Sequence, residues 1–297
     1  MRIKATPMER LFYLGNYVFL IVVSLMFLIP FISVLSTSFI STAEWARRGN
    51  FVLIPEAPTL EAYQFLFGGS KGTVFNAYKI TMFRTIVGTI LCLTFTGLGA
   101  YVLARRNLPG RTFMTLLVFI PMVFSGGLIP FYLVVDRLRL TNTVWIMITP
   151  FLVNPWWLLI MRNFLMTIPV ELEEAALMDG ANPLTVLIRV YLPLSMPALT
   201  TIGLFYAVWH WNGWFYAAVF NSNRDLYPIQ VILRSILYLG DASYRGDLGI
   251  MFEPEMMPPA QTLKAAMIIV TTVPILLVYP FIQRYFVKGM LIGGVKG

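Results

Sequence analysis

Six long apolar runs most constrain what this chain can fold into. They are residues 11–36, 80–103, 113–135, 143–161, 198–220 and 262–286, and each ends at charged or turn-forming residues. Each run has about the 20 residues that a helix needs to cross the hydrocarbon core of a membrane. With 58% hydrophobic and 12% charged residues, the chain is also far more apolar than a soluble domain. The sequence therefore predicts an all-α integral membrane protein with six transmembrane helices.

Loop charge favours one orientation of these runs. Arg105, Arg106 and Arg111 crowd the short loop between the second and third runs, and basic residues concentrate in cytoplasmic loops. The N-terminus is then cytoplasmic, and an even number of spans returns the C-terminus to the same side. The first run exceeds the apolar region of a signal peptide and no small-residue cleavage site follows it, so we interpret it as a retained span.

The remaining composition argues against several other classes. The net charge of +8 comes from basic residues scattered between the apolar runs, without the basic patch of a nucleic-acid-binding protein. The single cysteine, Cys92, excludes an internal disulfide and a cysteine-based metal site. No metal site is expected. The apolar runs contain neither paired carboxylates nor a Ser-His-Asp arrangement, so no residues at membrane depth indicate an enzyme.

A long outer loop and breaks within three of the apolar runs are two further features of the sequence. The outer loop 221–261 is the longest excursion from the membrane, and such a loop is typical of a surface for a soluble partner, with a passive connector as the alternative. Prolines and glycines also interrupt the third, fourth and sixth runs. Broken helices free backbone groups that a water-filled pathway or a packed interface must satisfy, and both readings stay open.

The segment 165–195, between the fourth and fifth runs, is too polar to cross a membrane. Residues 169–193 read PVELEEAALMDGANPLTVLIRVYLP. A proline and an acidic first turn begin one helix, Gly180 offers the left-handed conformation that ends it, and Asn182 opens a second helix that ends before Leu192. Small residues flanked by carboxylates suit docking into a groove on another protein.

The spacing in this segment resembles the cytoplasmic signature of the membrane subunits of ATP-binding-cassette (ABC) importers. That signature is Glu-Ala-Ala, three residues, Gly, nine residues, Ile, one residue and Leu-Pro. Only Val190 departs from it, standing where the family has Ile. The resemblance implies a type I ABC importer fold with a cytoplasmic coupling helix. It also implies that the ATPase-docking residues are Glu174, Ala175, Ala176, Asp179, Gly180, Leu192 and Pro193.

The resemblance covers nearly the whole chain and implies a substrate class. Asp179-Gly180-Ala181, Trp209 and Trp211-Asn212 are similar to the carbohydrate-uptake, maltose-type branch. Residues 125–130 and 239–257 are similar to subunits that move complex oligosaccharides, including alginate. The implied function is a single transmembrane permease domain, residues 1–297, that imports an oligosaccharide, with an acidic one such as alginate as a candidate.

The partners follow from the same resemblance. They are a second related permease, two cytoplasmic ATPase subunits and an extracytoplasmic solute-binding protein, assembled in the bacterial inner (cytoplasmic) membrane. The chain is expected to bind no cofactor, and ATP and Mg belong to the partner subunits. Residues 68–73, GGSKGT, lack the Gly-Lys-Ser/Thr ending of a phosphate-binding loop.

Aromatic and neutral polar side chains in the fifth run are candidates for a sugar pathway, because sugars bind to aromatic faces beside hydrogen-bonding groups. They are Trp209, His210, Trp211, Asn212, Trp214 and Tyr216. Helical spacing groups Trp209, Asn212 and Tyr216 on one face. An aromatic belt at the membrane interface is the alternative. For His210, a hydrogen-bonded structural role is expected.

Charge adds a second hypothesis and a competing class. Arg84 and Arg137, expected near the outer ends of their spans, are candidates to attract an acidic sugar, although snorkelling to the interface explains them as simply. The competing class is a self-sufficient channel or an ion-driven secondary transporter. It predicts intramembrane acidic residues and an internal repeat, whereas the apolar runs contain no Asp or Glu.

Overall fold

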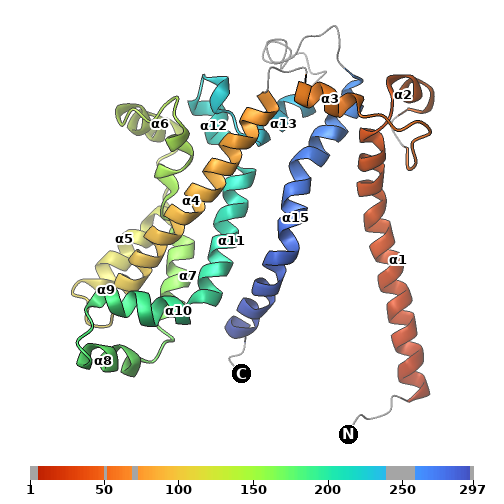
Figure 1. Cartoon of the computed structure of the whole chain (residues 1–297). Coiled ribbons are helices and arrows are strands. Elements are labelled where there is room, and N and C mark those ends of the chain that lie inside the picture. Colours follow the sequence, from red (N-terminus) through yellow and green to blue (C-terminus); the bar gives the residue numbers. More distant parts are fainter. Residues whose placement is uncertain (1–5, 50–51, 69–72, 239–257, 295–297) are drawn as a thin grey trace. The chain divides into compact units, whose positions relative to one another are not determined.

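The computed structural model describes residues 6–49, 52–68, 73–238 and 258–294, with side chains up to residue 280. Every regular element in those ranges is a helix (Figure 1). By length and composition, three helices can cross a membrane: α1 (Pro7–Ser38), α4 (Thr73–Ala104) and the described start of α15 (Ala260–Gly294). Three bent pairs bring the number to as many as six, which equals the number of predicted spans. The central part of the predicted outer loop, 239–257, lies outside the described residues.

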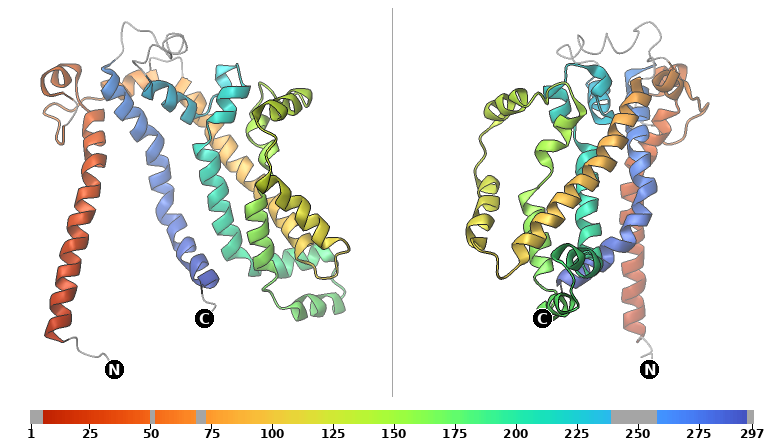
Figure 2. Two further views of the ribbon diagram at one scale, coloured as in Figure 1. Left: turned by 180° about the vertical axis from the view of Figure 1, so that it is seen from behind. Right: turned by 60° about the vertical axis from the view of Figure 1, so that its left-hand side comes forward.

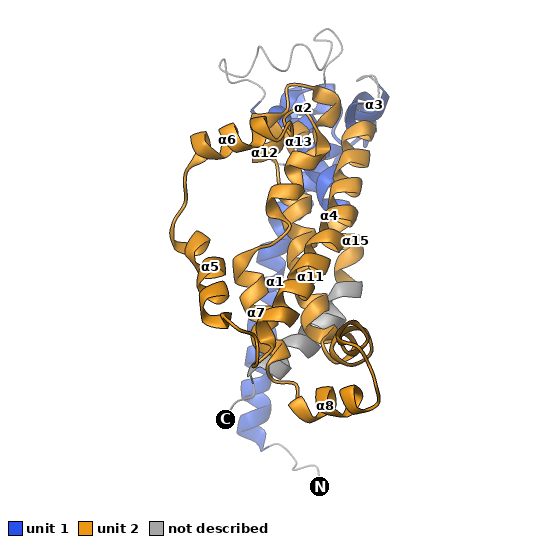
Figure 3. Ribbon diagram, turned by 90° about the vertical axis from the view of Figure 1, so that its left-hand side faces the viewer, with its two compact units in different colours: residues 1–74, 233–273 blue, residues 75–232, 274–297 orange. Residues whose placement is uncertain are grey.

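Contacts divide the chain into two compact units (Figure 3). Unit 1 comprises residues 1–74 and 233–273, and unit 2 comprises residues 75–232 and 274–297. The expectation of a single domain stays a prediction. Unit 2 contains both the polar loop 165–195 and the aromatic residues of the fifth run, so it carries the candidate sites.

Helix α1 of unit 1 begins with a complete capping box. The Thr6 hydroxyl accepts a hydrogen bond from the Glu9 backbone N–H, and the Glu9 carboxylate accepts one from the Thr6 backbone N–H. Beyond this start, buried residues occur only near the end of the helix, from Ser33 to Ser38. A helix that exposes apolar side chains on all sides is expected to face lipid or a neighbouring protein.

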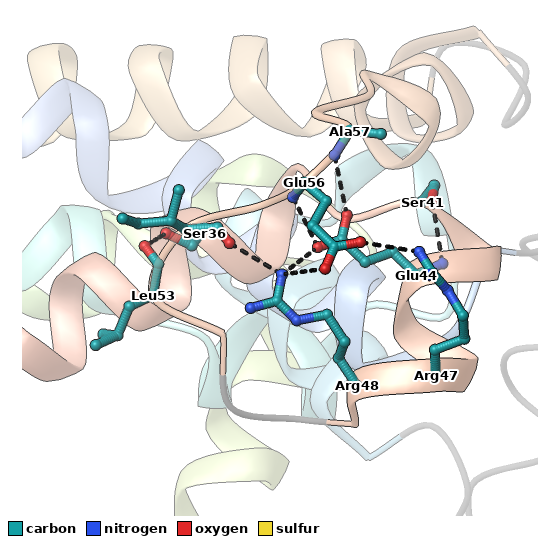
Figure 4. A network of polar contacts seen from close by, with 9 residues as sticks. Ser36, Ser41, Glu44, Arg47, Arg48, Leu53, Glu56 and Ala57 are labelled. Atoms are coloured by element: carbon teal, nitrogen blue, oxygen red, sulfur yellow. Dashed lines mark hydrogen bonds and ion pairs between the residues drawn. The ribbon is translucent and has the colours of Figure 1, made fainter.

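A polar network shapes the short helix α2 (Thr42–Arg48) that follows α1 (Figure 4). The buried Glu44 carboxylate accepts from the backbone N–H of Glu56 at 2.8 Å and of Ala57 at 3.3 Å, and it pairs with Arg48 at 2.8 Å. These contacts, led by the Glu56 backbone hydrogen bond, lower the pKa of Glu44. The network folds the chain back against α2 before α3 (Glu61–Gly68) begins.

Unit 2 is built around α4, α7 (Pro155–Leu165) and α11 (Met196–Asn212). Their apolar side chains form a buried cluster that includes Cys92, Met161 and Tyr206. In Figures 1 and 2, α4 and α11 run from one end of this unit to the other. One end carries α8 (Val170–Met178), α9 (Pro183–Val186) and α10 (Leu192–Leu194), and the other carries α12 (Phe215–Phe220).

Two bent helix pairs coincide with the predicted third and fourth spans, and a third pair joins the end of the polar loop 165–195 to the start of the predicted fifth span. Helices α5 (Arg111–Val123) and α6 (Leu128–Arg137) meet at 118° across a break that contains Gly127, whose φ is +83°. The 3-10 turns η1 (Val144–Met147) and η2 (Thr149–Phe151) meet α7 at 45°. The helical stretch from α9 to α10, which contains the π turn η3 (Leu187–Tyr191), meets α11 at 82°. Proline and glycine at such points account for the bends.

The fifth apolar run is also broken, although no proline marks the position. Helix α11 ends at Asn212, Gly213 is extended with φ −68° and ψ 126°, and α12 begins at Phe215. The spacing rule of a single helix therefore does not apply across Gly213. The 3-10 turn η4 (Arg224–Leu226) and α13 (Ile229–Leu237) follow.

Candidate functional site

The loop 165–195 forms two helical segments joined by a tight turn. Helix α8 begins after Pro169, and Gly180 adopts a φ of +80° just past its end. The backbone N–H of Gly180 bonds to the Leu177 carbonyl, and that of Ala181 bonds to the Ala176 carbonyl. This pair of bonds is typical of a helix terminated by glycine, which adopts positive φ without strain. The predicted turn at Gly180 is therefore present.

The helical segment after the turn extends further than predicted. Asn182 caps it by accepting from the Thr185 backbone N–H at 2.8 Å. Helix α9, the π turn η3 and α10 then follow without a gap, so the segment runs through Leu192 and Pro193. The expectation that it ends before Leu192 is wrong, because the wider π turn allows the chain to remain helical up to a proline that lacks an N–H donor.

One carboxylate, that of Glu173, fastens α8 to the rest of unit 2. Its Oε1 accepts from Arg105 Nη2 at 2.9 Å, and its Oε2 accepts from the Tyr191 hydroxyl at 2.7 Å. Arg105 also donates to the Tyr101 hydroxyl at 3.2 Å, and Tyr101 donates to the Pro183 carbonyl at 3.1 Å. Burial, together with Glu173, raises the pKa of Tyr191. These charge-assisted bonds join α8 to the end of α4 and to η3.

The docking residues implied by the sequence lie on and beside α8. Glu174, Ala175, Asp179, Gly180 and Pro193 are exposed, whereas Ala176 and Leu192 are half-buried against the core cluster. A notch of about 430 Å³ lies between α8 and α9, and Ala176, Asp179, Gly180 and Arg189 are among its lining residues. The arrangement leaves small residues and carboxylates accessible on a segment whose backbone is held in place.

A second feature is an aromatic cavity of about 610 Å³ beside the bends of unit 2. Trp209 and Tyr216 line it, from the two sides of the break at Gly213. Phe151 lies between them, with ring centroids 5.0 Å from Trp209 and 4.5 Å from Tyr216. Other lining residues are Ser125, Phe131, Asn154, Trp157 and Tyr206. Ring faces beside a few hydroxyl and amide groups suit a sugar.

The other pathway candidates lie elsewhere. His210 is fully buried, with its Nε2 3.5 Å from the sulfur of Cys92, and Trp211 is also buried. Asn212 is exposed and donates to the Val208 carbonyl at 3.0 Å. Trp214 is half-buried and packs at the edge of a cluster around Ala217 and Phe220. Of the six candidates in the fifth run, the structure therefore brings Trp209 and Tyr216 together at the cavity.

The two arginine candidates occupy different environments. Arg137 is exposed at the end of α6. Arg84 is 1% exposed, and its Nη1 donates to the Gly213 carbonyl at 2.6 Å, while its guanidinium carbon lies 5.8 Å from the centre of the Trp209 ring. Arg84 therefore contacts the break between α11 and α12, and it touches the cavity indirectly, through Trp209.

Sequence reasoning missed several residues of both features. It did not assign Glu173, Arg105, Phe151 or Asn154 to either site, because their contacts join segments that are distant in the sequence. Asn154 before Pro155 carried a usable signal, because Asn followed by Pro commonly begins a helix, and Asn154 does cap α7. Among the described residues, no group of three or more His, Cys, Asp or Glu lies close enough to hold a metal ion.

These bent spans and the exposed α8 loop define an all-helical membrane transport subunit, and comparisons with known proteins agree. Residues 94–292 match the family described as "Binding-protein-dependent transport system inner membrane component". The chain is 42% identical to the polygalacturonan/rhamnogalacturonan transport system permease protein YtcP of Bacillus subtilis (strain 168), over 97% of this chain and 99% of that protein. It is likewise 42% identical to the protein LplC of the same organism, over 98% of this chain and 97% of LplC.

A solved structure agrees as well. A chain of a bacterial ABC transporter involved in the import of the acidic polysaccharide alginate matches with a TM-score of 0.82 and 32% identity, over 96% of this chain and 99% of that one. The chain therefore belongs to the family of binding-protein-dependent transport system inner membrane components. It is the permease subunit of an ABC importer, which confirms the fold and the transport class that the loop signature implied.

Proposed function

We propose that this permease imports an oligosaccharide, of the acidic class, as part of an assembly driven by separate ATPase subunits. The observation that carries the proposal is the coexistence, within unit 2, of an anchored α8 loop and an aromatic cavity. The named relative transports polygalacturonan and rhamnogalacturonan, and the matching solved transporter imports an acidic polysaccharide, which supports the substrate class.

In this proposal the α8 loop docks into a cleft on an ATPase subunit. Exposed Glu174, Asp179 and Gly180 provide the contact surface, and Glu173 passes movement of α8 to α4 through Arg105. The ATPase subunits bind ATP and Mg²⁺, and the permease itself binds no cofactor. A second permease completes the pathway, and a solute-binding protein delivers the sugar. Docking to a cytoplasmic ATPase places α8 and both termini on the cytoplasmic side of the inner membrane.

The cavity provides part of the sugar pathway. Trp209 and Tyr216 offer ring faces to a sugar, while Ser125 and Asn154 are placed to hydrogen-bond its hydroxyl groups. Exposed Arg137 attracts an acidic sugar by long-range electrostatics, an effect that salt weakens. Arg84 has a different role here, because its buried guanidinium holds the Gly213 carbonyl.

The test is uptake by the assembled complex in liposomes, with the binding protein present, of an oligomer of uronic acids and of a neutral oligomer of equal length. We expect preference for the acidic oligomer. Trp209→Ala and Tyr216→Ala should each lower its uptake about threefold to tenfold, because an aromatic face contributes about 0.5–1.5 kcal/mol. Trp156→Ala is the matched control, since Trp156 is 60% exposed and does not line the cavity. Preference for the neutral oligomer, or equal effects of all three variants, would refute the proposal.

A further inference from the structure

Two arginines from different helices converge on one carbonyl near the α8 end of unit 2. Nε of Arg111, the first residue of α5, donates to the Leu103 carbonyl at 3.0 Å. Nε of Arg162, in the last turn of α7, donates to the same oxygen at 3.2 Å. Leu103 lies in the last turn of α4, so both cations face the negative end of that helix dipole.

The bonds to the Leu103 carbonyl use only one N–H group of each arginine. Each guanidinium has five N–H groups. Arg111 also directs Nη2 to the sulfur of Met166 at 3.0 Å, and Arg162 directs Nη1 to Asn163 Oδ1 at 3.4 Å. Within the described ranges neither arginine forms an ion pair, whereas neighbouring Arg105 pairs with Glu173 at 2.9 Å. Two positive charges therefore lie together without a protein carboxylate to balance them.

An apolar groove begins at these two cations. Its volume is about 500 Å³, and between Arg111 and Arg162 it is lined by Thr112, Thr115, Leu116, Phe119 and Leu159. Leu116 and Phe119 are exposed and follow Arg111 along α5. One end of the groove thus carries the two cations, and its wall further along α5 is apolar.

The start of α5 adds to the positive potential at that end. Its N-cap residue, Gly110, has φ +70° and provides no side-chain cap. The Arg111 N–H donates to the Leu108 carbonyl at 3.3 Å, and the N–H groups that follow it at this helix N-terminus favour an anion. The chain then enters the apolar part of α5, so the cationic end lies at the border between water and lipid.

We propose that this groove binds an anionic phospholipid. The phosphate lies between Arg111 and Arg162, with the N-terminus of α5 beside it, and an acyl chain lies along Leu116, Phe119 and Leu159. The bound lipid would brace the junction of α4, α5 and α7, which adjoins the Arg105–Glu173 contact with α8. This binding site does not depend on which substrate is transported. In the orientation proposed above, it would lie in the cytoplasmic leaflet of the membrane.

Native mass spectrometry of the purified full complex, taken from nanodiscs of phosphatidylglycerol and phosphatidylcholine in equal amounts, tests this proposal. In the double variant Arg111→Gln, Arg162→Gln, we expect the ratio of retained phosphatidylglycerol to phosphatidylcholine to be about fivefold or more below that of the wild type. Arg106→Gln removes an exposed cation from the same loop and should leave the ratio unchanged.

A second variant keeps both charges and fills the groove. Leu116 is 51% exposed, so Leu116→Trp should fold normally and still lower lipid retention, even if the double arginine variant does not assemble. Equal retention of the two lipids by the wild type would overturn the proposal. So would unchanged retention in Leu116→Trp, or displacement of the lipid by millimolar inorganic phosphate, which would indicate a site for a free anion.

Discussion

At the scale of single residues, the buried Arg84 and its contact with Gly213 mark the point where the fifth span breaks. Charged side chains within a membrane are costly unless polar groups surround them. Here Arg84 meets the Gly213 carbonyl, at the point where α11 ends and leaves that carbonyl outside the helical pattern. A Cβ on Gly213 would collide with the guanidinium, so the glycine makes room for the contact. Arg84 and Gly213 thereby fix the break that places Trp209 and Tyr216 at the cavity.

A glycine also makes room for His210, which leads to a prediction. A Cβ on Gly88 in α4 would lie 2.5 Å from Nε2 of the fully buried His210 ring. Gly88→Ala should therefore overpack the α4–α11 contact and destabilise the protein by about 1–3 kcal/mol. Gly97→Ala in the same helix has no atom within 4 Å of its new Cβ and should be neutral or slightly stabilising. Thermal unfolding in detergent measures both, and equal midpoints would contradict the prediction.

At the scale of elements, two adjacent glutamates of α8 have different surroundings. Glu173 and Glu174 are adjacent, yet Glu173 is turned to Arg105 and Tyr191 while Glu174 is exposed. One carboxylate can thus hold the element while its neighbour contacts a partner. The proposed docking and the proposed transmission of movement can therefore be separated by mutation.

We predict that Glu173→Gln uncouples transport while leaving the ATPase subunit bound. The variant loses charge-assisted bonds worth about 1.5–3 kcal/mol, so ATPase stimulation by the loaded binding protein should fall about tenfold or more. Glu171→Gln, an exposed change in the first turn of α8, is the matched control and should leave stimulation intact. Glu174→Ala with Asp179→Ala should instead reduce co-purification of the ATPase. If Glu173→Gln also loses the ATPase, the assigned division between the two glutamates is wrong.

Helix α2 provides a pH-dependent element. The pKa of Glu44 is lowered in the folded protein, so its stabilising contribution is present above the ordinary value of 4.5 and is lost as pH falls through the lower folded pKa. Protection of the Glu56 and Ala57 amides from hydrogen exchange, corrected for intrinsic rates, should therefore decrease below pH 4.5. In Glu44→Gln this acid-dependent loss should disappear, whereas Glu61→Gln, an exposed change, should retain it. Acid-independent protection in the wild type would refute the role of Glu44.

At the scale of the whole molecule, the chain is one part of a larger assembly. The apolar 18-residue stretch of α1 is 6% buried, whereas the corresponding stretches of α4 and of the described start of α15 are each 39% buried. So much exposed apolar surface requires lipid, other subunits or both. The family, whose members are inner membrane components of larger transport systems, agrees with this requirement.

The sequence by itself determined the features that depend on neighbours along the chain. Runs of apolar residues predicted the spans, because a helix satisfies its own backbone within the membrane. The loop signature predicted the turn at Gly180 and the transport class, since helix ends and family signatures are encoded within a few residues. These local signals required no knowledge of which helices pack together.

Only the tertiary structure decided which side chains meet across long stretches of sequence. It brought Arg84 to Gly213, Glu173 to Arg105, and Arg111 beside Arg162, and it separated His210 from the cavity that Trp209 lines. Composition and spacing could not predict these contacts, because each apolar helix could turn several faces inward. Packing of the whole unit selects one of them, and with it the residues that form each site.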